Sequence, residues 1–309
     1  MSIGMVFPGQ GSQSVGMLAD LAQAYPVVKA TFAQASQVLG YDLWALCQEG
    51  PEDQLNQTQR TQPALLAAGV AVWRVWQERG GAQPIAMAGH SLGEYSALVC
   101  AESIGFAEAV ALVARRGELM QEAVPVGVGA MAAILNLDDE AVAGVCVDAA
   151  QGDVVQAVNF NAPGQIVIAG HKAAVDRAIV LATERGARRA LLLSVSVPSH
   201  CRLMEAPARK LADELEKIEV KRPRISVLHN VDGQIRQDPA AIRDALVKQL
   251  HNPVRWVETY QGLVRQGAKA IIEAGPGKVL AGLGKRIEKE TSIVPVFDTA
   301  SLDQGLSLV

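Results

Sequence analysis

The chain has 309 residues, half of them apolar and 19% charged, with a formal net charge of −4 at pH 7. This composition is typical of a soluble globular protein, and the length allows one large hydrophobic core or two modest ones. A negative net charge argues against nucleic-acid binding, which usually needs a strongly basic domain or stripe. The cysteines show no CxxC and no metal-ligand spacing, so we expect reduced, buried thiols and no metal site at Cys47, Cys100, Cys146 and Cys201.

The N-terminal sequence MSIGMVFPGQ lacks the basic n-region and the long apolar h-region of a signal peptide. No apolar run reaches the roughly 18 residues that suggest a membrane span, because charges, glycines or prolines interrupt every candidate. We therefore expect a cytoplasmic protein that does not bind membranes.

Short apolar runs predict buried strands, at 3–7, 85–89, 225–230, 270–275 and 292–297. Residues 106–124 and 240–250 repeat apolar side chains at intervals of three and four, which indicates helices. The alternation of strands and helices predicts a mostly parallel α/β sheet that is covered on both faces.

The segment 124–195 has a different order of elements. It predicts a strand in GAMAAIL, a helix near 138–149, two strands in VVQAVNFNAPGQIVIAG, a helix near 172–185 and a strand in RRALLLSV (188–195). The turn at 161–164 contains the Pro and Gly that a tight turn favours. This βαββαβ order is that of a ferredoxin-like subdomain. We predict an α/β-hydrolase-like core over 1–123 and 196–309, with the subdomain inserted over 124–195.

The pentapeptide Gly89-His90-Ser91-Leu92-Gly93 follows one predicted strand and begins a helical pattern. Gly-x-Ser-x-Gly in this context is a nucleophile elbow, in which the serine sits on a strained strand-to-helix turn. Its hydroxyl then lies at a helix N-terminus, where free N–H groups favour a developing oxyanion. The pentapeptide alone also fits a tight turn without chemistry.

A nucleophilic serine needs a base, and the sequence offers five histidines: His90, His171, His200, His229 and His251. The stronger candidates are His200 in SVPSHCRLM and His251 in KQLHNPVRW. The aspartates between Ser91 and His200 all fall in the inserted segment and not at the end of a core strand: Asp138, Asp139, Asp148, Asp153 and Asp176. Spacing alone leaves both the base and its orienting group open.

Arg116 is an independent indication of a ligand. In a helix over 106–124, its neighbours three and four residues away are all apolar: Leu112, Val113, Leu119 and Met120. The guanidinium therefore faces the interior, where it needs a carboxylate from the protein or from a ligand. Arg115, by contrast, has Glu118 three residues on and can lie at the surface. An internal ion pair and a ligand clamp both remain possible for Arg116.

Two glycine-rich loops follow predicted strands, FPGQGSQSVGM and EAGPGKVLAGLGKR. The first does not match a dinucleotide-binding fingerprint, because Ser14 stands in place of the third glycine. The second lacks the GK[ST] ending of a P-loop. We expect both loops to bring backbone close to a site at the carboxyl ends of the parallel strands.

Eight segments of the chain together resemble bacterial malonyl-CoA:acyl carrier protein transacylases, a family that shares its pattern with the acyltransferase domains of polyketide and fatty acid synthases. In chain order they are FPGQGSQSVGM, TQPAL, GHSLGEYSAL, RRGELMQEAV, NFNAPGQIVIAG, VPSHCRLM, LHNPVRW and EAGPGKVL. The resemblance spans nearly the whole chain. It implies transfer of malonyl from malonyl-CoA to the phosphopantetheine thiol of acyl carrier protein, through a malonyl-serine and without a cofactor, in fatty acid biosynthesis.

The resemblance also implies roles for single residues. Ser91 would be the nucleophile, His200 its general base and Arg116 the clamp on the malonyl carboxylate. The other implied roles are an oxyanion hole from the N–H groups of Gln10 and Leu92, a base-orienting main-chain carbonyl at Gln249, and a lining position for His90. His251 then becomes a structural neighbour.

The implied partners are malonyl-CoA and an acidic acyl carrier protein, and we expect a monomer. Candidate docking cations, each of which could equally be a solvated surface charge, are Lys221, Arg222, Arg224, Arg185, Arg188, Arg189, Lys285, Arg286 and Lys289. A serine (thio)esterase, a non-catalytic carrier-binding scaffold and a trans-acting acyltransferase of a polyketide system remain alternatives. In synthase domains the residue before the histidine correlates with acyl preference, and some enzymes that use branched malonyl groups have a serine there, as this chain has Ser199. The stand-alone family has the sequence PSH and uses malonyl, so we expect malonyl as the acyl group.

Overall fold

The computed structural model describes residues 1–125, 127–193, 195 and 197–308. The first part of the chain forms β1 (Ile3–Phe7), α1 (Ala19–Ala24), α2 (Pro26–Leu39), α3 (Leu43–Glu49), α4 (Glu52–Leu55), α5 (Thr58–Glu78), β2 (Ala86–Gly89), α6 (Gly93–Cys100) and α7 (Phe106–Ala123). The middle part forms β3 (Gly129–Leu135), α8 (Asp139–Ala150), β4 (Val155–Ala162), β5 (Gln165–His171), α9 (Lys172–Glu184) and β6 (Arg189–Leu192). The last part forms the 3-10 helix η1 (Arg202–Met204), α10 (Glu205–Leu215), β7 (Ser226–Leu228), α11 (Pro239–His251), α12 (Trp256–Arg265), β8 (Ala270–Ala274), α13 (Val279–Ile287), β9 (Ser292–Val296) and α14 (Thr299–Leu306).

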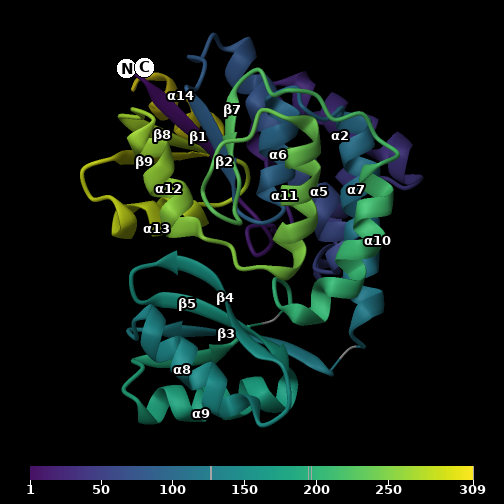
Figure 1. Ribbon diagram of the computed structural model, residues 1–309. Helices are drawn as coiled ribbons and strands as arrows, with labels where there is room; N and C mark the ends of the chain where they lie inside the picture. Colours follow the sequence, from purple (N-terminus) through teal and green to yellow (C-terminus); the bar gives the residue numbers. More distant parts are fainter. Residues whose placement is uncertain (126, 194, 196, 309) are drawn as a thin grey trace.

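The larger sheet is parallel, with strand order β7-β2-β1-β8-β9. Alternate side chains of β1 enter two different cores, because successive residues of a strand point to opposite faces. Ile3, Met5 and Phe7 pack with α5, α6 and α7, whereas Val6 packs with α12 and α13. Figure 1 shows these two groups of helices on either side of the sheet. The predicted covered α/β sheet is therefore confirmed.

The smaller sheet is antiparallel, with strand order β4-β5-β3-β6. Helices α8 and α9 cover one face and enclose a separate apolar core (Figure 1). The opposite face holds Met131, Val158 and Val167 around Cys201, which belongs to the larger part of the chain. The edge strand β4 also pairs with the segment at Val254, through hydrogen bonds of 2.9 Å and 3.0 Å.

The predicted βαββαβ order is confirmed over the described part of 129–192. Ser194, within the predicted strand 188–195, and Ser196, at the predicted domain boundary, lie outside the described residues. The division into units 1–123 with 196–309, and 124–195, stays a prediction. The four cysteines are free and buried, as expected.

Helices α1 to α5 were not predicted from the sequence, nor were α10 and α12 to α14. The longest of them, α5, buries side chains on nearly all sides and contains Pro63 and Gly69. It therefore lacks the one-sided apolar pattern by which an amphipathic helix is recognised. Within the described residues, no helix has the length and apolar character that crossing a membrane requires.

Candidate active site

Ser91 lies on a sharp turn between β2 and α6, with a positive φ of 51°. This turn needs glycine at two positions, because the Cβ of any other residue there would overlap backbone atoms. A Cβ on Gly89 would lie 1.8 Å from the carbonyl carbon of Gly93, and a Cβ on Gly93 would lie 2.1 Å from the oxygen of Phe7. The pentapeptide therefore has the strained geometry of a nucleophile elbow.

His200 is the histidine that contacts Ser91, and their Nε2 and Oγ atoms are 2.8 Å apart. Its Nδ1 lies 2.7 Å from the main-chain oxygen of Gln249. A carbonyl can only accept, so Nδ1 carries the proton and Nε2 presents a lone pair to the serine hydroxyl. The geometry therefore favours His200 over His251, with a carbonyl in the position that a carboxylate occupies in a Ser-His-Asp triad.

His200 is buried, with 3% of its surface exposed. Burial, followed by the positive charge of Arg116, lowers the pKa of His200 to about 3. The imidazole is therefore neutral near pH 7 and available to accept a proton.

Arg116 projects from α7 into the same interior and is 1% exposed. Its Nη1 donates to Gln62 Oε1 at 2.8 Å, and its Nη2 donates to Gln249 Oε1 at 3.1 Å and to Ser91 Oγ at 3.4 Å. Among the described residues, Nε has no hydrogen-bond partner and no carboxylate forms an ion pair with this guanidinium. Burial lowers the pKa of Arg116. Of the two possibilities raised by the sequence, the arrangement favours a ligand carboxylate.

Gln10 and Leu92 both line the cavity that contains Ser91. Gln10 follows β1 in the first glycine-rich loop, and Leu92 is the N-cap residue of α6. This loop passes close to the elbow, since a Cβ on Gly9 would lie 2.4 Å from the oxygen of His90. Among the residues that the structure describes, no backbone oxygen accepts a hydrogen bond from the N–H group of Gln10 or of Leu92. Both groups are therefore available to a developing oxyanion.

His90 also lines the cavity, and its Nε2 lies 2.8 Å from Asn161 Oδ1. Its ring packs 5.3 Å from the ring of Trp256, and loss of hydration lowers the pKa of His90. The ring is held beside the serine without contacting its hydroxyl.

The remaining histidines have other partners or positions. His171, at the end of β5, has its Nδ1 3.1 Å from Asp153 Oδ1. His229 is fully buried, and its Nδ1 lies 2.7 Å from Glu94 Oε1. His251 ends α11, and no described residue hydrogen-bonds its Nδ1. Arg115 pairs with Glu118 at 2.9 Å, as predicted for a surface residue.

The cavity has a volume of about 190 Å³ and lies between the two sheets. Its lining from the smaller sheet includes Met131, Asn159 and Val167, and its lining from α13 includes Leu280 and Leu283. The sequence patterns indicated no part in the active site for Gln62, Asn161, Glu94 or Asn230. Gln62, Glu94 and Asn161 do lie in three of the quoted segments, TQPAL, GHSLGEYSAL and NFNAPGQIVIAG, whereas only the fold brings Asn230 to the serine.

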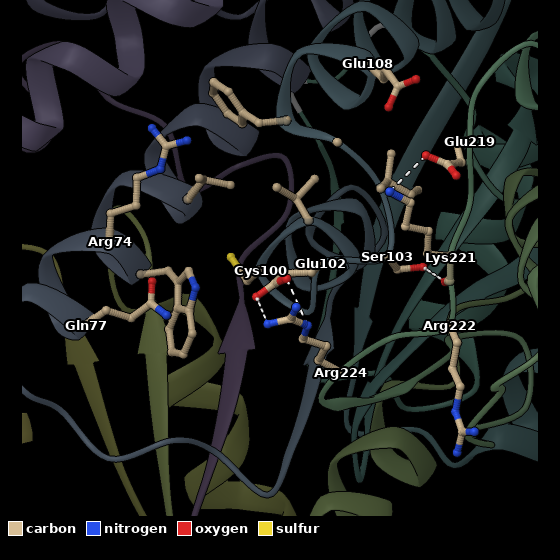
Figure 2. Close-up of a pocket in the computed structure, with 16 residues that line it drawn as sticks. Arg74, Gln77, Cys100, Glu102, Ser103, Glu108, Glu219, Lys221, Arg222 and Arg224 are labelled. Carbon is tan, nitrogen blue, oxygen red and sulfur yellow. Dashed lines mark hydrogen bonds and ion pairs between the residues drawn. The ribbon is translucent and has the colours of Figure 1, made fainter.

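A second cavity of about 510 Å³ shares no lining residue with the first. Figure 2 shows its ion pairs, Arg224 with Glu102 at 3.1 Å and Lys221 with Glu219 at 2.9 Å. Three of the candidate docking cations therefore line a different cavity from the one at Ser91. Arg286, in contrast, donates to the oxygen of Pro163 at 2.9 Å and to Gln165, which lines the active-site cavity.

Comparison with known families gives a match to the acyl transferase domain over residues 5–300. The chain belongs to the acyl transferase family. Within it, the malonyl CoA-acyl carrier protein transacylase of Escherichia coli strain K12 is 61% identical over 303 residues, which are 98% of each chain. This acyltransferase is therefore a member of the group that its sequence motifs resemble.

Solved structures of the family have the same fold. An acyl carrier protein S-malonyltransferase from Vibrio cholerae superposes with a TM-score of 0.96 at 62% identity, over 98% of this chain and 99% of the other. A malonyl-transacylase in complex with a type II PKS acyl-carrier protein gives a TM-score of 0.99 at 60% identity, over 100% of both chains. The predicted fold class is thus confirmed by relatives as well as by the strand order.

Proposed function

We propose that this acyltransferase moves the malonyl group of malonyl-CoA to the phosphopantetheine thiol of acyl carrier protein, supplying fatty acid biosynthesis. The observation that carries the proposal is Arg116, a fully buried cation beside Ser91 Oγ with no carboxylate partner among the described residues. A free carboxylate on the acyl group satisfies that cation. Malonyl carries one and acetyl does not. The names of the relatives point to the same substrate.

In the first half-reaction, His200 Nε2 takes the hydroxyl proton of Ser91 as Oγ attacks the thioester carbonyl. The N–H groups of Gln10 and Leu92 stabilise the tetrahedral oxyanion. The carbon–sulfur bond then breaks, and CoA leaves as a thiol with the proton that His200 returns. The product is a malonyl ester on Ser91.

In the second half-reaction, His200 takes the proton of the carrier's phosphopantetheine thiol as the sulfur attacks the ester. The bond to Ser91 Oγ breaks, and Oγ recovers the proton from the imidazolium. Gln249 keeps the ring in the required tautomer through both steps, because its carbonyl holds the Nδ1 proton. Neither step needs a cofactor, and the two together give ping-pong kinetics.

The same transfer could serve a polyketide synthase. The observation that favours this second candidate is the solved relative in complex with a type II PKS acyl-carrier protein. The chemistry at Ser91 is identical in the two cases, so the carrier protein decides the pathway. We further expect a cytoplasmic monomer that approaches the carrier through the surface around Arg286.

Intact-mass measurement after treatment with malonyl-CoA tests the proposal. We expect one malonyl adduct on the wild-type chain and none on Ser91→Ala. His200→Ala should form the adduct on the order of 100 to 10,000 times more slowly, the usual contribution of a general base. An adduct on Ser91→Ala, or no adduct on the wild type as for a non-catalytic scaffold, would contradict the proposal.

A further inference from the structure

Glu94 is a fully buried carboxylate in the first turn of α6, three residues after Ser91. It accepts three hydrogen bonds. Oε1 accepts from His229 Nδ1 at 2.7 Å, and Oε2 accepts from the backbone N–H of Asn230 and from Gln249 Nε2, each at 2.9 Å. Among the described residues, its ion-pair contact is with His229 and with no lysine or arginine. This carboxylate is therefore held by hydrogen-bond donors of the site and not by a counter-ion at the surface.

The side-chain amides of Gln249 and Asn230, the two residues that bind Glu94 Oε2, can each adopt only one orientation. Arg116 has only donors, so Gln249 must present Oε1 to it and Nε2 to Glu94. Asn230 Oδ1 accepts from Ser91 N–H at 2.7 Å, and its Nδ2 donates to the oxygen of Gly89 at 2.7 Å. Both amides are consequently fixed by partners that cannot exchange roles.

Asn230 and Gln249 connect Glu94 to both members of the reacting pair. The Asn230 side chain holds the backbone before the strained turn, at the oxygen of Gly89 and the N–H of Ser91. Gln249 Nε2 also donates to the main-chain oxygen of Ser91 at 2.9 Å, and its own main-chain oxygen holds the base, His200. A shift of Glu94 would therefore disturb the placement of both the nucleophile and the base.

We propose that Glu94 is a positioning residue for acyl transfer, which sets the nucleophile of Ser91 against the lone pair of His200 through Asn230 and Gln249. The inference rests on the proposed function of Ser91 and His200. Glu94 touches neither substrate nor reacting atoms, so its removal should lower kcat for Ser91 acylation and leave the KM for malonyl-CoA nearly unchanged.

The test is single-turnover acylation by malonyl-CoA, followed by intact mass, with thermal unfolding in parallel. In Glu94→Ala we expect the acylation rate to fall on the order of 100-fold, the effect of a displacement of about 1 Å at reacting atoms. The KM should stay within about threefold, because uniform substrate binding is not removed.

Glu94→Gln is the conservative rescue. Its Oε1 can accept from Asn230 N–H and Gln249 Nε2, while its Nε2 faces His229, whose ring can present an unprotonated Nδ1. We expect this variant to recover to within about tenfold of the wild-type rate, since one orientation satisfies all of these donors. If Glu94→Ala does not fold, Glu94→Asp replaces it, because the shorter side chain keeps the charge and withdraws from at least one donor.

Thr31→Ala is the control for loss of a buried polar group. Thr31 is also fully buried, and its Oγ1 donates to the oxygen of Val27 at 2.7 Å and accepts from Arg74 Nη1 at 2.9 Å, and none of these three residues lines the cavity at Ser91. It should lower the unfolding temperature, as Glu94→Ala does, with a saturating acylation rate within about twofold of wild type. The inference is overturned if the folded Glu94 variants acylate at the wild-type rate, if only KM changes, or if Thr31→Ala loses the same rate. If the wild type itself gives no Ser91 adduct, the proposed function fails instead.

Discussion

Arg116 and His200 share one buried space, and each affects what the other can do. The guanidinium needs an anion that the described residues do not supply, and its charge helps to keep the imidazole neutral. The carboxylate of a bound malonyl group would be the anion that Arg116 needs. Its negative charge would also offset the positive charge near His200 when the imidazolium forms.

Arg116→Ala should therefore change donor selectivity. Loss of a buried charge pair costs about 2 to 5 kcal/mol, so malonyl transfer should fall roughly 30- to 5,000-fold. Acetyl transfer, which makes no such pair, should change far less. The measurement is intact-mass competition between malonyl-CoA and acetyl-CoA. Arg115→Ala, one residue earlier but paired at the surface with Glu118, is the control and should keep wild-type selectivity. Equal losses for both acyl groups would remove the clamp assignment.

The pH dependence of acylation follows from the lowered pKa of His200. A base with a pKa of about 3 is already deprotonated at pH 5, so the acylation rate should be flat from about pH 5 to 8. The charge of Arg116 is the second cause of this shift, after burial. In Arg116→Ala the pKa of His200 should rise, so the acid-side decline of the acylation rate should begin at a higher pH than in wild type. A wild-type inflection between pH 6 and 7 would contradict this picture.

At the residue scale, local patterns predicted part of the site. The spacing of glycines around Ser91 and the apolar neighbours of Arg116 are properties of one segment each, and both interpretations agree with the geometry. The choice of His200, and its carbonyl partner at Gln249, came from resemblance and not from spacing. Glu94 and Asn230 were missed because their contacts join α6 to the loop after β7, and no local pattern encodes such a contact.

At the scale of elements, α13 is held to the sheet by a carboxylate at its N-terminus. Glu273 on β8 accepts from Leu280 N–H at 2.9 Å and from Ala281 N–H at 2.7 Å. This explains why a glycine-rich loop, EAGPGK, joins β8 to the helix: Gly275 and Gly277 both have positive φ values. Leu280 and Leu283, on the same helix, then reach the active-site cavity.

Glu273 should make the stability of the protein depend on pH. Burial raises the pKa of Glu273 from 4.5 to about 7, so the folded chain holds a proton that the unfolded chain releases in between. Its contribution is fully present below pH 4.5 and is lost as the pH rises through about 7, a change of roughly 3 kcal/mol.

Glu273→Gln cannot lose a proton, so its unfolding free energy should decline less than that of wild type between about pH 5 and 8. Urea unfolding at several pH values measures this difference. Parallel pH profiles for the two proteins would show that Glu273 does not titrate in this range.

The bounds of an element were predictable where a single pattern, a continuous apolar run or an apolar repeat at three and four residues, extends along its whole length. The five parallel strands and α7 belong to this class. Helix α5 does not, because burial on nearly all sides removes the amphipathic signal. It nevertheless carries Gln62, which binds Arg116, so a helix without a recognisable pattern supplies part of the site.

At the scale of the whole molecule, the cavity exists because two sheets meet. Ser91, Arg116 and His200 come from the larger part of the chain, whereas Asn161 and Val167 close the cavity from the smaller sheet. The pairing of β4 with the segment at Val254 holds these parts together. Ser91 is only partly exposed where it lines this cavity, so an ester on it has limited contact with bulk water, which favours transfer to a long phosphopantetheine arm over hydrolysis.

The fate of the malonyl group tests the central claim most directly. Purified protein is given malonyl-CoA with and without a phosphopantetheinylated acyl carrier protein, and malonyl-carrier and free malonate are measured over time. We predict that the carrier receives nearly all of the malonyl group and that, without it, the ester on Ser91 persists. Release of free malonate as fast as carrier loading would contradict the account and identify a thioesterase.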